Sequence, residues 1–348
     1  MKAFGILIVG LVLGSCAGSA GTPDQGAKGL QVYWIDVEGG AATLVVTPAG
    51  ESLLFDCGWP EKRDAERIRD VAANLAKVKR IDHYFTTHWH EDHWGGVEGL
   101  TALMPIGTFY DHGFPPGQHG DISPKLKEAY LKACQGKSVV LKPGDTVSLR
   151  PSYGSAALKL DVLASNGQVL GEGAGSPQVR ACEKHPPQPV DTSDNARSLA
   201  FRLSFGDFRF IDFGDLTWNL EHKLVCPKNL IGSVDVYQVT HHGWDASNNP
   251  ALLQAISPMA AVIDNGPKKG GVAKVFAFLK ATPSIRDVYQ LHRNVETGPG
   301  DNAPAPFVAN DDEACKGAWI RMTVEPDGKR YTIQIPAKGT SRTYSTKS

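Results

Sequence analysis

Residues 88–96, with the sequence HWHEDHWGG, gather the side chains of this chain that are best suited to bind metal ions. Neutral imidazoles and carboxylates are the ligands that zinc and its first-row neighbours prefer. His88 and His90 are two positions apart, so in an extended segment both point to the same side of the backbone. Asp92 and His93 follow where the chain turns, and they can face a second point nearby. The segment therefore predicts a loop that supplies a pair of ligands to each of two metal ions, rather than a histidine-rich surface turn.

Two later segments end in side chains of the same kinds, each directly after a run that is expected to form a strand. The run 208–213 leads into the sequence GD at 214–215, and a carboxylate has two oxygens with which it can bridge two nearby cations. The run 234–240 leads into the sequence HHG at 241–243. Each of these short sequences is common in ordinary turns. Three such segments at the ends of separate strands together predict one binuclear metal centre.

Short strands are the elements expected to position these segments, because β-branched and aromatic runs alternate with Gly and Pro. The expected strands are 30–37, 41–48, 51–56, 81–88, 158–163, 198–205, 208–213, 234–240, 261–264 and 318–324. Apolar residues recur at helical spacing in 61–76, 124–134, 250–256 and 272–280. This order of elements predicts sheets covered by helices. Loop insertions rich in Gly, Pro, Ser and Asp are expected near 111–123, 165–195 and 294–316, and are interpreted as walls of a pocket.

The first 20 residues have the features of a secretory signal: an early lysine, an apolar run too short to cross a membrane, and then small residues. The sequence LGSC at 13–16 also resembles the lipobox of bacterial lipoproteins, in which Cys16 would become the lipidated first residue. Cleavage near Ala20 is the alternative. Residues 21–29 then form a tether. The protein is expected to be exported, either periplasmic or anchored to the outer membrane, with that lipid as its only membrane attachment.

The amino-acid composition limits the kinds of partner that this protein is expected to bind. The formal net charge is −1, from 36 basic and 37 acidic residues, so there is no basic surplus of the kind that nucleic-acid-binding proteins carry. A small-molecule or cell-envelope substrate is expected instead. Five of the six cysteines follow the signal, and this odd number leaves at least one thiol unpaired. Cys57 is the expected free thiol, because it directly follows a run interpreted as a buried strand.

The pattern HxHxDH after a strand, then a strand-ending GD and a strand-ending histidine, resembles the metallo-β-lactamase fold superfamily over roughly residues 30–335. The resemblance implies an α/β fold, an αββα sandwich of two mixed β-sheets flanked by helices, with a binuclear metal site at the sheet edge. The domain is expected to span 30–340. The sequence LLFDCG at 53–58 is similar to an early motif of the superfamily, which implies that Asp56 orients the ligand loop.

Residues 194–221 and 241–247 resemble one branch, the hydrolase domain of competence-type (ComEC-like) DNA-uptake proteins and the related exported phosphorylcholine esterases. The matching residues are Asn195, Ser198, Glu221 and the sequence HHGWDAS, which ends at Ser247. No channel segments that could span a membrane accompany the domain. The branch's His-Pro is absent around 270–274.

The resemblance also implies a role for each candidate residue. His88, His90 and Asp215 would hold the first metal ion. The second ion would be held by Asp92, His93, Asp215 and His241, with His241 favoured over His242 as the ligand of the pair. His242 would then contact substrate.

Asn195 takes the place of a further histidine that lactamase-type and glyoxalase-type members supply to the first metal. Three histidines occur in this region, but His112, His119 and His185 all lie in loops without the expected setting. His292, at a strand-to-loop junction near the end of the chain, is not expected to be a metal ligand.

The expected function is an exported metal-dependent hydrolase of phosphoester or phosphodiester bonds, acting through a metal-bridged hydroxide. Its cofactors would be two divalent ions, with Zn²⁺ as the first choice and Mn²⁺ or Fe as alternatives. Asp92 would orient the hydroxide, and His242 and Asn195 would donate hydrogen bonds to substrate. Two alternatives remain: a lactam or lactone (carboxylic amide or ester) hydrolase, and a non-catalytic metal-binding surface lipoprotein.

Overall fold

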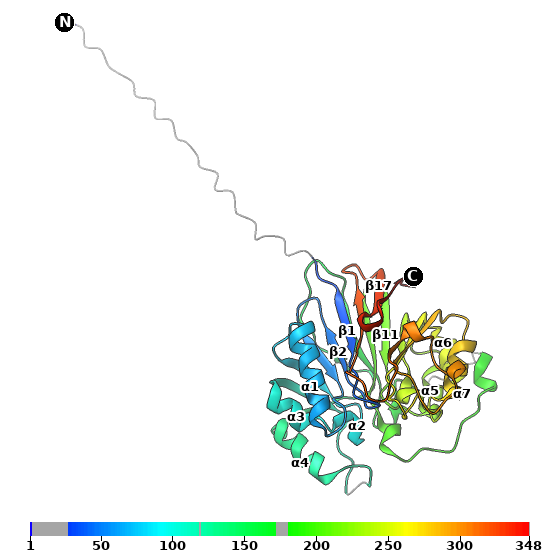
Figure 1. Ribbon diagram of the computed structural model, residues 1–348. Helices are drawn as coiled ribbons and strands as arrows, with labels where there is room; N and C mark the ends of the chain where they lie inside the picture. The colour runs from blue at the N-terminus through cyan, green and yellow to red at the C-terminus, as the bar shows by residue number, and fades with distance from the viewer. Residues whose placement is uncertain (2–26, 118–119, 172–179, 348) are drawn as a thin grey trace.

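Two β-sheets packed face to face form the centre of the molecule, with helices on both outer sides (Figure 1). The computed structural model describes Met1 and residues 27–117, 120–171 and 180–347, and within these ranges each sheet has nine strands. The α/β fold and the αββα sandwich expected from the sequence are confirmed. The expected signal, Cys16 and most of the tether lie outside the described residues, as does His119.

The first sheet has the strand order β18-β17-β16-β1-β2-β3-β4-β5-β6. Neighbouring strands are antiparallel from β18 to β3 and parallel from β3 to β6. Its strands are β1 (Leu30–Trp34), β2 (Thr43–Val46), β3 (Ser52–Phe55), β4 (Ile81–Phe85), β5 (Ile106–Asp111), β6 (Ser138–Val140), β16 (Ile320–Val324), β17 (Arg330–Ile335) and β18 (Thr340–Ser345).

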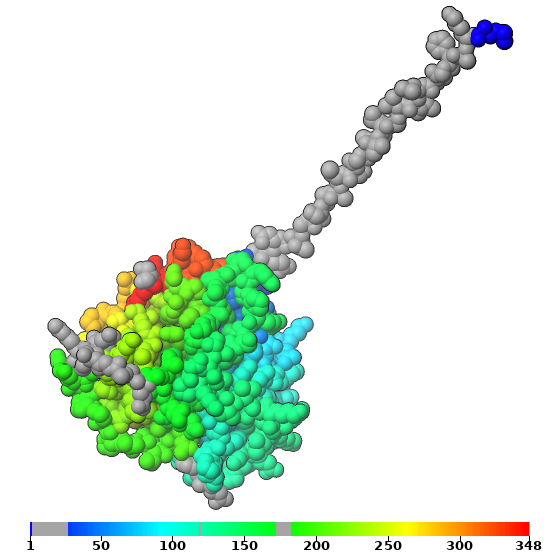
Figure 2. Space-filling model, turned by 180° about the vertical axis from the view of Figure 1, so that it is seen from behind, coloured from blue at the N-terminus to red at the C-terminus, as the bar shows by residue number. Residues whose placement is uncertain are grey.

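The second sheet has the order β15-β14-β13-β12-β11-β10-β8-β7, with β9 paired to β8. It is parallel from β15 to β11 and antiparallel from β11 to β7. Its strands are β7 (Thr146–Val147), β8 (Leu158–Ser165), β9 (Gln168–Val169), β10 (Ala200–Phe205), β11 (Phe208–Asp212), β12 (Val236–Gln238), β13 (Ala260–Ile263), β14 (Asp287–His292) and β15 (Val308–Asn310). The chain passes from the first sheet to the second between β6 and β7, and residues of this cyan-to-green middle part cover much of the face seen from behind (Figure 2).

Helices cover the outer face of each sheet (Figure 1). On the first sheet lie α1 (Lys62–Asp70), which continues as a π-helical turn (Val71–Leu75), α2 (Glu91–Trp94), α3 (Val97–Leu103) and α4 (Pro124–Ala133). On the second lie α5 (Trp218–Val225), α6 (Pro250–Ile256) and α7 (Ala273–Ala281). The core between the sheets is apolar and includes Phe55 and Phe85, stacked with ring centres 4.7 Å apart, and Phe201, whose ring edge meets both. Burial of these faces is what holds the four layers together.

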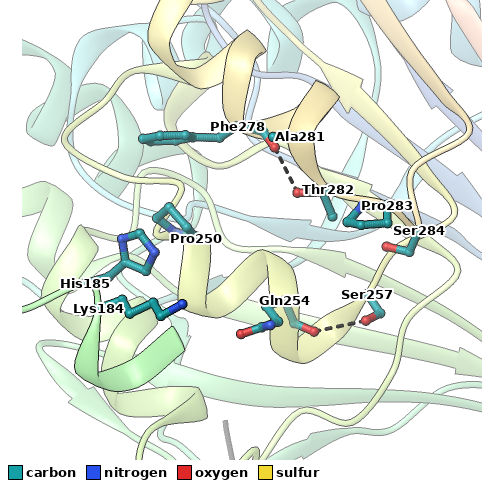
Figure 3. Close-up of a pocket in the computed structure, with 10 residues that line it drawn as sticks. All are labelled: Lys184, His185, Pro250, Gln254, Ser257, Phe278, Ala281, Thr282, Pro283 and Ser284. Carbon is teal, nitrogen blue, oxygen red and sulfur yellow. Dashed lines mark hydrogen bonds between the residues drawn. The ribbon is translucent and has the colours of Figure 1, made fainter. Parts of the chain in front are cut away.

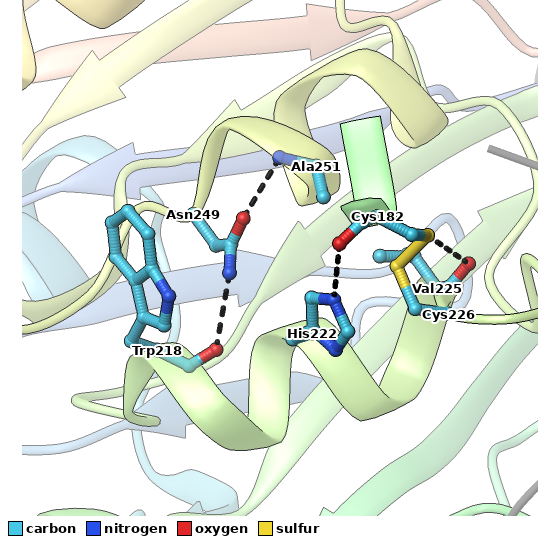
Figure 4. Close-up of a disulfide and its surroundings, with 7 residues drawn as sticks. All are labelled: Cys182, Trp218, His222, Val225, Cys226, Asn249 and Ala251. Carbon is cyan, nitrogen blue, oxygen red and sulfur yellow. Dashed lines mark hydrogen bonds between the residues drawn. A yellow bond between two sulfur atoms is a disulfide. The ribbon is translucent and has the colours of Figure 1, made fainter. Parts of the chain in front are cut away.

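One disulfide, Cys182–Cys226, joins a short 3₁₀ turn (Arg180–Glu183) to the end of α5 (Figure 4). His222, on α5, donates a hydrogen bond from Nε2 to the Cys182 carbonyl, at 3.3 Å. Among the described residues the free cysteines are Cys57, as expected, with Cys134 and Cys315. In the same described part of the chain, no helix has the length and apolar character needed to cross a membrane.

Candidate metal centre

The ligand loop follows β4, and α2 carries two of its ligand-type side chains at one edge of the sheets (Figure 1). Trp89 and Trp94 are fully buried, so both are packing residues. Trp89 stacks on Phe114 with ring centres 4.1 Å apart, and its Nε1 donates to the Gly113 carbonyl at 3.2 Å. These anchors fix the backbone between the histidines of the loop.

The two glycines after the ligand loop allow neighbouring backbone to approach closely. A Cβ on Gly96 would lie 2.1 Å from the Cys57 carbonyl oxygen, and one on Gly95 would lie 2.3 Å from the Glu91 carbonyl oxygen. Both positions therefore exclude any larger side chain. This close packing places the start of α3 directly against the segment that follows β3.

Two groups of donor atoms converge at this edge, and within each group all donor atoms lie within 4.8 Å of one another. One contains His88, His90 and Asp215; the other contains Asp92, His93, Asp215 and His242. Asp215, which follows β11, belongs to both. Its Oδ2 lies 3.8 Å from His88 Nε2, and its Oδ1 lies 3.3 Å from His93 Nε2 and 3.5 Å from His242 Nε2. The two oxygens of one carboxylate thus face the two groups, which is the arrangement of a bridging ligand.

In the structure His242, and not His241, belongs to the second donor group, and these two histidines follow β12. His242 Nε2 lies 3.2 Å from Asp92 Oδ2 and belongs to the second donor group, whereas the sequence favoured His241 there. His241 Nε2 instead lies 3.4 Å from Asp215 Oδ2, and its Nδ1 lies 3.2 Å from Ser247 Oγ. The cause is local backbone geometry: both histidines have positive φ, 56° and 51°, so their rings leave the chain in directions that an extended strand end would not give.

Asp56 supports the ligand loop from behind, as the resemblance implied. Its Oδ2 lies 2.7 Å from His93 Nδ1 and accepts a hydrogen bond from Thr87 Oγ1 at 2.6 Å, and its Oδ1 accepts from Thr87 N at 2.7 Å. Ser198 has a similar task, because its Oγ accepts a hydrogen bond from the Asp215 backbone N–H at 3.2 Å. Hydrogen bonds of this kind fix the orientation of imidazole and carboxylate ligands.

Burial and charge act against each other at the centre. Burial together with the neighbouring His93 keeps the pKa of His88 well below its usual range. Burial would also lower the pKa of His93, but Asp215, Asp92 and Asp56 hold it well above the usual value. Burial would raise the pKa values of Asp92 and Asp215, yet the surrounding imidazoles hold both well below their usual range. The centre is thus a buried concentration of carboxylates that requires positive charge.

The residues fit a pair of divalent cations. His88 Nε2 and Asp215 Oδ1 are buried atoms that make no hydrogen bond with the described residues, and each faces a donor group. A buried polar atom without a partner costs stability, and coordination of a cation would satisfy both atoms. Imidazole nitrogens and carboxylate oxygens are the donors that zinc, manganese and iron accept.

Comparison with known proteins agrees with this geometry. Residues 35–149 match the family model described as metallo-beta-lactamase superfamily. This part of the chain is a metallo-β-lactamase domain. The matched range contains β2 to β7 and all four ligand-type side chains of the loop, so it covers the first sheet's half of the centre.

Similarity to individual proteins covers more of the chain than the family model does. The chain is 24% identical to ComE operon protein 3 of Bacillus subtilis over 255 residues, which are 68% of this chain and 28% of that protein. It is 39% identical over 70 residues to ribonuclease Z of Gemmatimonas aurantiaca, 20% of each chain, and 35% identical over 85 residues to atrochrysone carboxyl ACP thioesterase of Aspergillus terreus, 23% and 25% of the two chains. The chain thus spans at most 28% of these relatives' length. The first of them agrees with the expected likeness to the ComEC-like branch of the superfamily.

Asn195 lies beside the ligand loop of this metallo-β-lactamase fold. The neighbouring Asp194 accepts a hydrogen bond from the Trp89 backbone N–H at 2.7 Å, and its same oxygen lies 3.1 Å from His112 Nε2. His112 is therefore held by a carboxylate outside both donor groups. Asn195 is 8% exposed, and its Oδ1 makes no hydrogen bond within the described part of the chain. His185 lies elsewhere, with its ring centre 6.4 Å from that of Trp218.

Sequence reasoning missed Lys269. Its Nζ contacts Asp92 Oδ2 and lies 4.9 Å from the centre of the Trp59 ring. It occupies the loop after β13, where the expected His-Pro was absent. A lysine in a Gly-rich loop carries no signal of its own, so only the folded chain reveals that this ammonium group reaches the centre.

A surface hollow of about 700 Å³ lies away from these residues, between α6, α7 and the segment around His185 (Figure 3). Two of its hydroxyls are satisfied locally: Thr282 Oγ1 donates to the Phe278 carbonyl at 2.8 Å, and Ser257 Oγ donates to the Gln254 carbonyl at 2.9 Å. None of the residues that line it belongs to either donor group. The hollow is therefore not part of the metal centre.

Proposed function

We propose that this protein is an exported metal-dependent hydrolase of phosphoester or phosphodiester bonds. The observation that carries the proposal is Asp215, whose two oxygens face two separate donor groups. In this proposal one cation is held by His88, His90 and Asp215. The other is held by Asp92, His93, Asp215 and His242. The likeness to ribonuclease Z supports the phosphodiester class.

Two divalent cations at these positions, with Zn²⁺ as the first choice, would lower the pKa of water and neutralise charge on the oxygens of a substrate. The chain's own residues then orient the reactants. We assign to Asp92 the hydrogen bond that holds the attacking water, because its carboxylate belongs to the second donor group and its side chain keeps 9% of its surface exposed. His242, which was expected to contact substrate, has a fully buried side chain and is assigned to metal binding.

Two cationic or polar groups favour an anionic substrate. His241 keeps 14% of its side chain exposed beside Asp215, and Lys269 keeps 29% exposed beside Asp92. An ammonium group and an imidazole edge at the rim of the centre would attract a phosphoryl group and contact its oxygens. The unpartnered Oδ1 of Asn195 suits a hydroxyl of the substrate, whereas its amide N–H donors suit an oxyanion.

Export remains part of the proposal. The apolar first 20 residues and the LGSC sequence that ends at Cys16 motivate it. The Cys182–Cys226 disulfide supports it, because structural disulfides persist mainly in oxidising compartments. A globomycin-sensitive, lipid-labelled mature form would establish lipidation at Cys16, and its absence with secretion intact would favour cleavage near Ala20.

The activity test uses the purified full chain loaded with Zn²⁺ or Mn²⁺ and four substrates: bis(p-nitrophenyl) phosphate, a phosphorylcholine ester, a chromogenic cephalosporin and an acyl thioester. Turnover of the phosphorus esters that a chelator abolishes, and that Asp215→Asn lacks, is the expected result. A second candidate, hydrolysis of carboxylic esters or amides, is favoured by the likeness to a thioesterase and would be adopted if only the last two substrates react. Metal content near two ions per chain without any turnover would instead favour a binding protein.

A further inference from the structure

Three side chains of metal-binding type meet at a second place in the fold, and the binuclear centre uses none of them. Asp36 follows β1 in the first sheet, His292 ends β14 in the second, and Cys315 lies in the loop after β15. Asp36 and His292 are fully buried, and Cys315 is half-buried. Segments 279 positions apart in the chain thus bring a carboxylate, an imidazole and a thiol together.

The donor atoms of these residues converge on one point. His292 Nε2 lies 2.8 Å from Asp36 Oδ1, Cys315 Sγ lies 3.0 Å from Asp36 Oδ2, and Cys315 Sγ lies 3.7 Å from His292 Nε2. The same imidazole nitrogen faces both the carboxylate and the thiol. A nucleophilic relay needs the carboxylate and the thiol on opposite ring nitrogens, so the geometry excludes one. It is instead the arrangement in which three ligands share a cation.

The charges around the cluster leave room for a divalent cation. Arg67 lies 3.0 Å from Asp36 Oδ2, 3.1 Å from Glu38 Oε1 and 3.6 Å from Cys315 Sγ, so the two carboxylates and the thiol share this guanidinium, whose charge offsets that of one carboxylate. The rest of the cluster is the Asp36 carboxylate, the His292 imidazolium, which can release one proton, and the Cys315 thiol, which can release another. A divalent cation that displaces these two protons leaves the net charge of the buried cluster unchanged, which avoids the cost of burying an uncompensated charge.

We propose that Asp36, His292 and Cys315 form a third cation site, separate from the binuclear centre, that binds one zinc-like divalent ion. A thiolate with an imidazole selects zinc and its neighbours over magnesium and calcium, which prefer oxygen donors. Glu38 Oε1, 3.9 Å from Cys315 Sγ, offers a fourth donor.

The bound ion would brace the two sheets against each other. Its ligands come from β1 of the first sheet and β14 of the second, and the segment after Asp36 reaches the binuclear centre, where the Ala41 backbone N–H donates to the Asp92 carbonyl at 3.0 Å. The site is therefore structural, and through the segment after Asp36 it supports the backbone of the ligand loop.

Cobalt substitution distinguishes this site from the binuclear centre. The centre offers only nitrogen and oxygen donors, so a thiolate-to-Co²⁺ charge-transfer band in the near ultraviolet reports the third site alone. We expect the band in the full chain, purified without reductant and loaded with Co²⁺. It should disappear in Cys315→Ser and remain in Cys134→Ser, a matched control in which another buried thiol, with only the Leu131 carbonyl as partner, is removed.

Metal analysis gives the second readout. After equilibration with Zn²⁺ and gel filtration, Cys315→Ser should retain about one ion fewer per chain than wild type, and Asp215→Asn should keep the cobalt–thiolate band. Absence of the band from cobalt-loaded wild-type protein would overturn the proposal without reliance on any variant. A band that persists in Cys315→Ser would overturn it as well, because the thiolate would then belong to another cysteine.

Discussion

Neighbouring residues of the same type can have different tasks, and His241 and His242 are the clearest case in this chain. His242 has a fully buried side chain and points Nε2 at Asp92 and Asp215, while its Nδ1 lies 3.3 Å from the Asp264 carbonyl oxygen. His241 points toward the same Asp215 from the more exposed side. A histidine held at Nδ1 by a carbonyl presents Nε2 as a ligand with a fixed orientation.

This difference predicts opposite effects of two alanine substitutions. His242→Ala should bind about one metal ion fewer per chain, because it removes a donor of the second group. His241→Ala should keep the metal content and lose roughly 10²-fold in kcat, as expected when a substrate contact is removed. Metal analysis and steady-state kinetics of the two variants check this. A loss of metal in His241→Ala with none in His242→Ala would return the pair to the order favoured by the sequence.

Asp56 is predicted to act on metal affinity although it touches no metal position. Asp56→Asn keeps the size of the side chain but weakens the hold on His93 Nδ1 and Thr87, and should weaken metal binding by about 10- to 100-fold. Competition with a chromophoric chelator measures the change. Asp235→Asn is the matched control, since Asp235 is a buried carboxylate that accepts hydrogen bonds from the backbone of Arg209 and Lys347, far from the donor groups. Equal losses in both variants would mean that burial of a carboxylate, and not its contact with His93, causes the effect.

Residue types and spacing were sufficient to predict which side chains gather at the centre. His88, Asp92 and Asp215 meet because each follows a strand, and strand ends are visible as the boundary between an apolar run and polar residues. The order of His241 and His242 was not predictable, because it depends on two consecutive positive φ angles. Lys269 was not predictable either, since its contact with Asp92 depends on the path of a glycine-rich loop.

At the scale of elements, the expected strands are mostly ones with buried faces, although the buried strands β14 and β15 were not expected. β10 and β11 are largely buried and were expected within two residues of their bounds. β18 was missed because four of its six residues are exposed, so an edge strand of this kind has no apolar pattern. α5 was missed because its sequence, WNLEHKLV, is short and mixes charged with apolar residues. Its importance lies in a tertiary contact: Glu221 Oε2 accepts a hydrogen bond from the Asn249 backbone N–H at 2.8 Å, at the start of α6.

Glu221 gives α5 a pH-dependent effect on stability. Burial raises the pKa of this carboxyl from 4.5 to about 7. The folded protein therefore keeps a proton that the unfolded chain releases above pH 4.5, and the free energy of unfolding falls as pH rises from 4.5 to about 7. Glu221→Gln removes this part of the slope, so its stability relative to wild type should increase by roughly 2–3 kcal/mol across that range.

Chemical denaturation at a series of pH values measures this difference. Glu98→Gln, an exposed position on α3, is the control and should run parallel to wild type. Parallel curves for Glu221→Gln as well would mean that the carboxyl is not protonated in the folded protein.

At the scale of the whole molecule, the centre lies across the junction of the two sheets. Its donors follow β4 in the first sheet and β11 and β12 in the second, so neither sheet can complete a site alone. A cation bound there joins the two halves of the sandwich. It also binds the folded chain and not the unfolded one, which makes metal binding a term in the stability of the whole fold.

Removal of metal should therefore lower the thermal stability of the entire domain. An ion present at 100 times its Kd contributes about 2.7 kcal/mol, which for a chain of this size corresponds to a fall in Tm of roughly 4 °C for each ion. Scanning calorimetry with and without a chelator measures the fall, and Zn²⁺ in excess over the chelator should restore Tm. The fall that remains in Cys315→Ser would be assigned to the binuclear centre, while Asp215→Asn, which lacks the shared ligand, should show only the share of the third site. Identical melting of wild-type protein before and after chelation would contradict the view that ions join the two sheets, because a ligand that binds only the folded state must raise its stability.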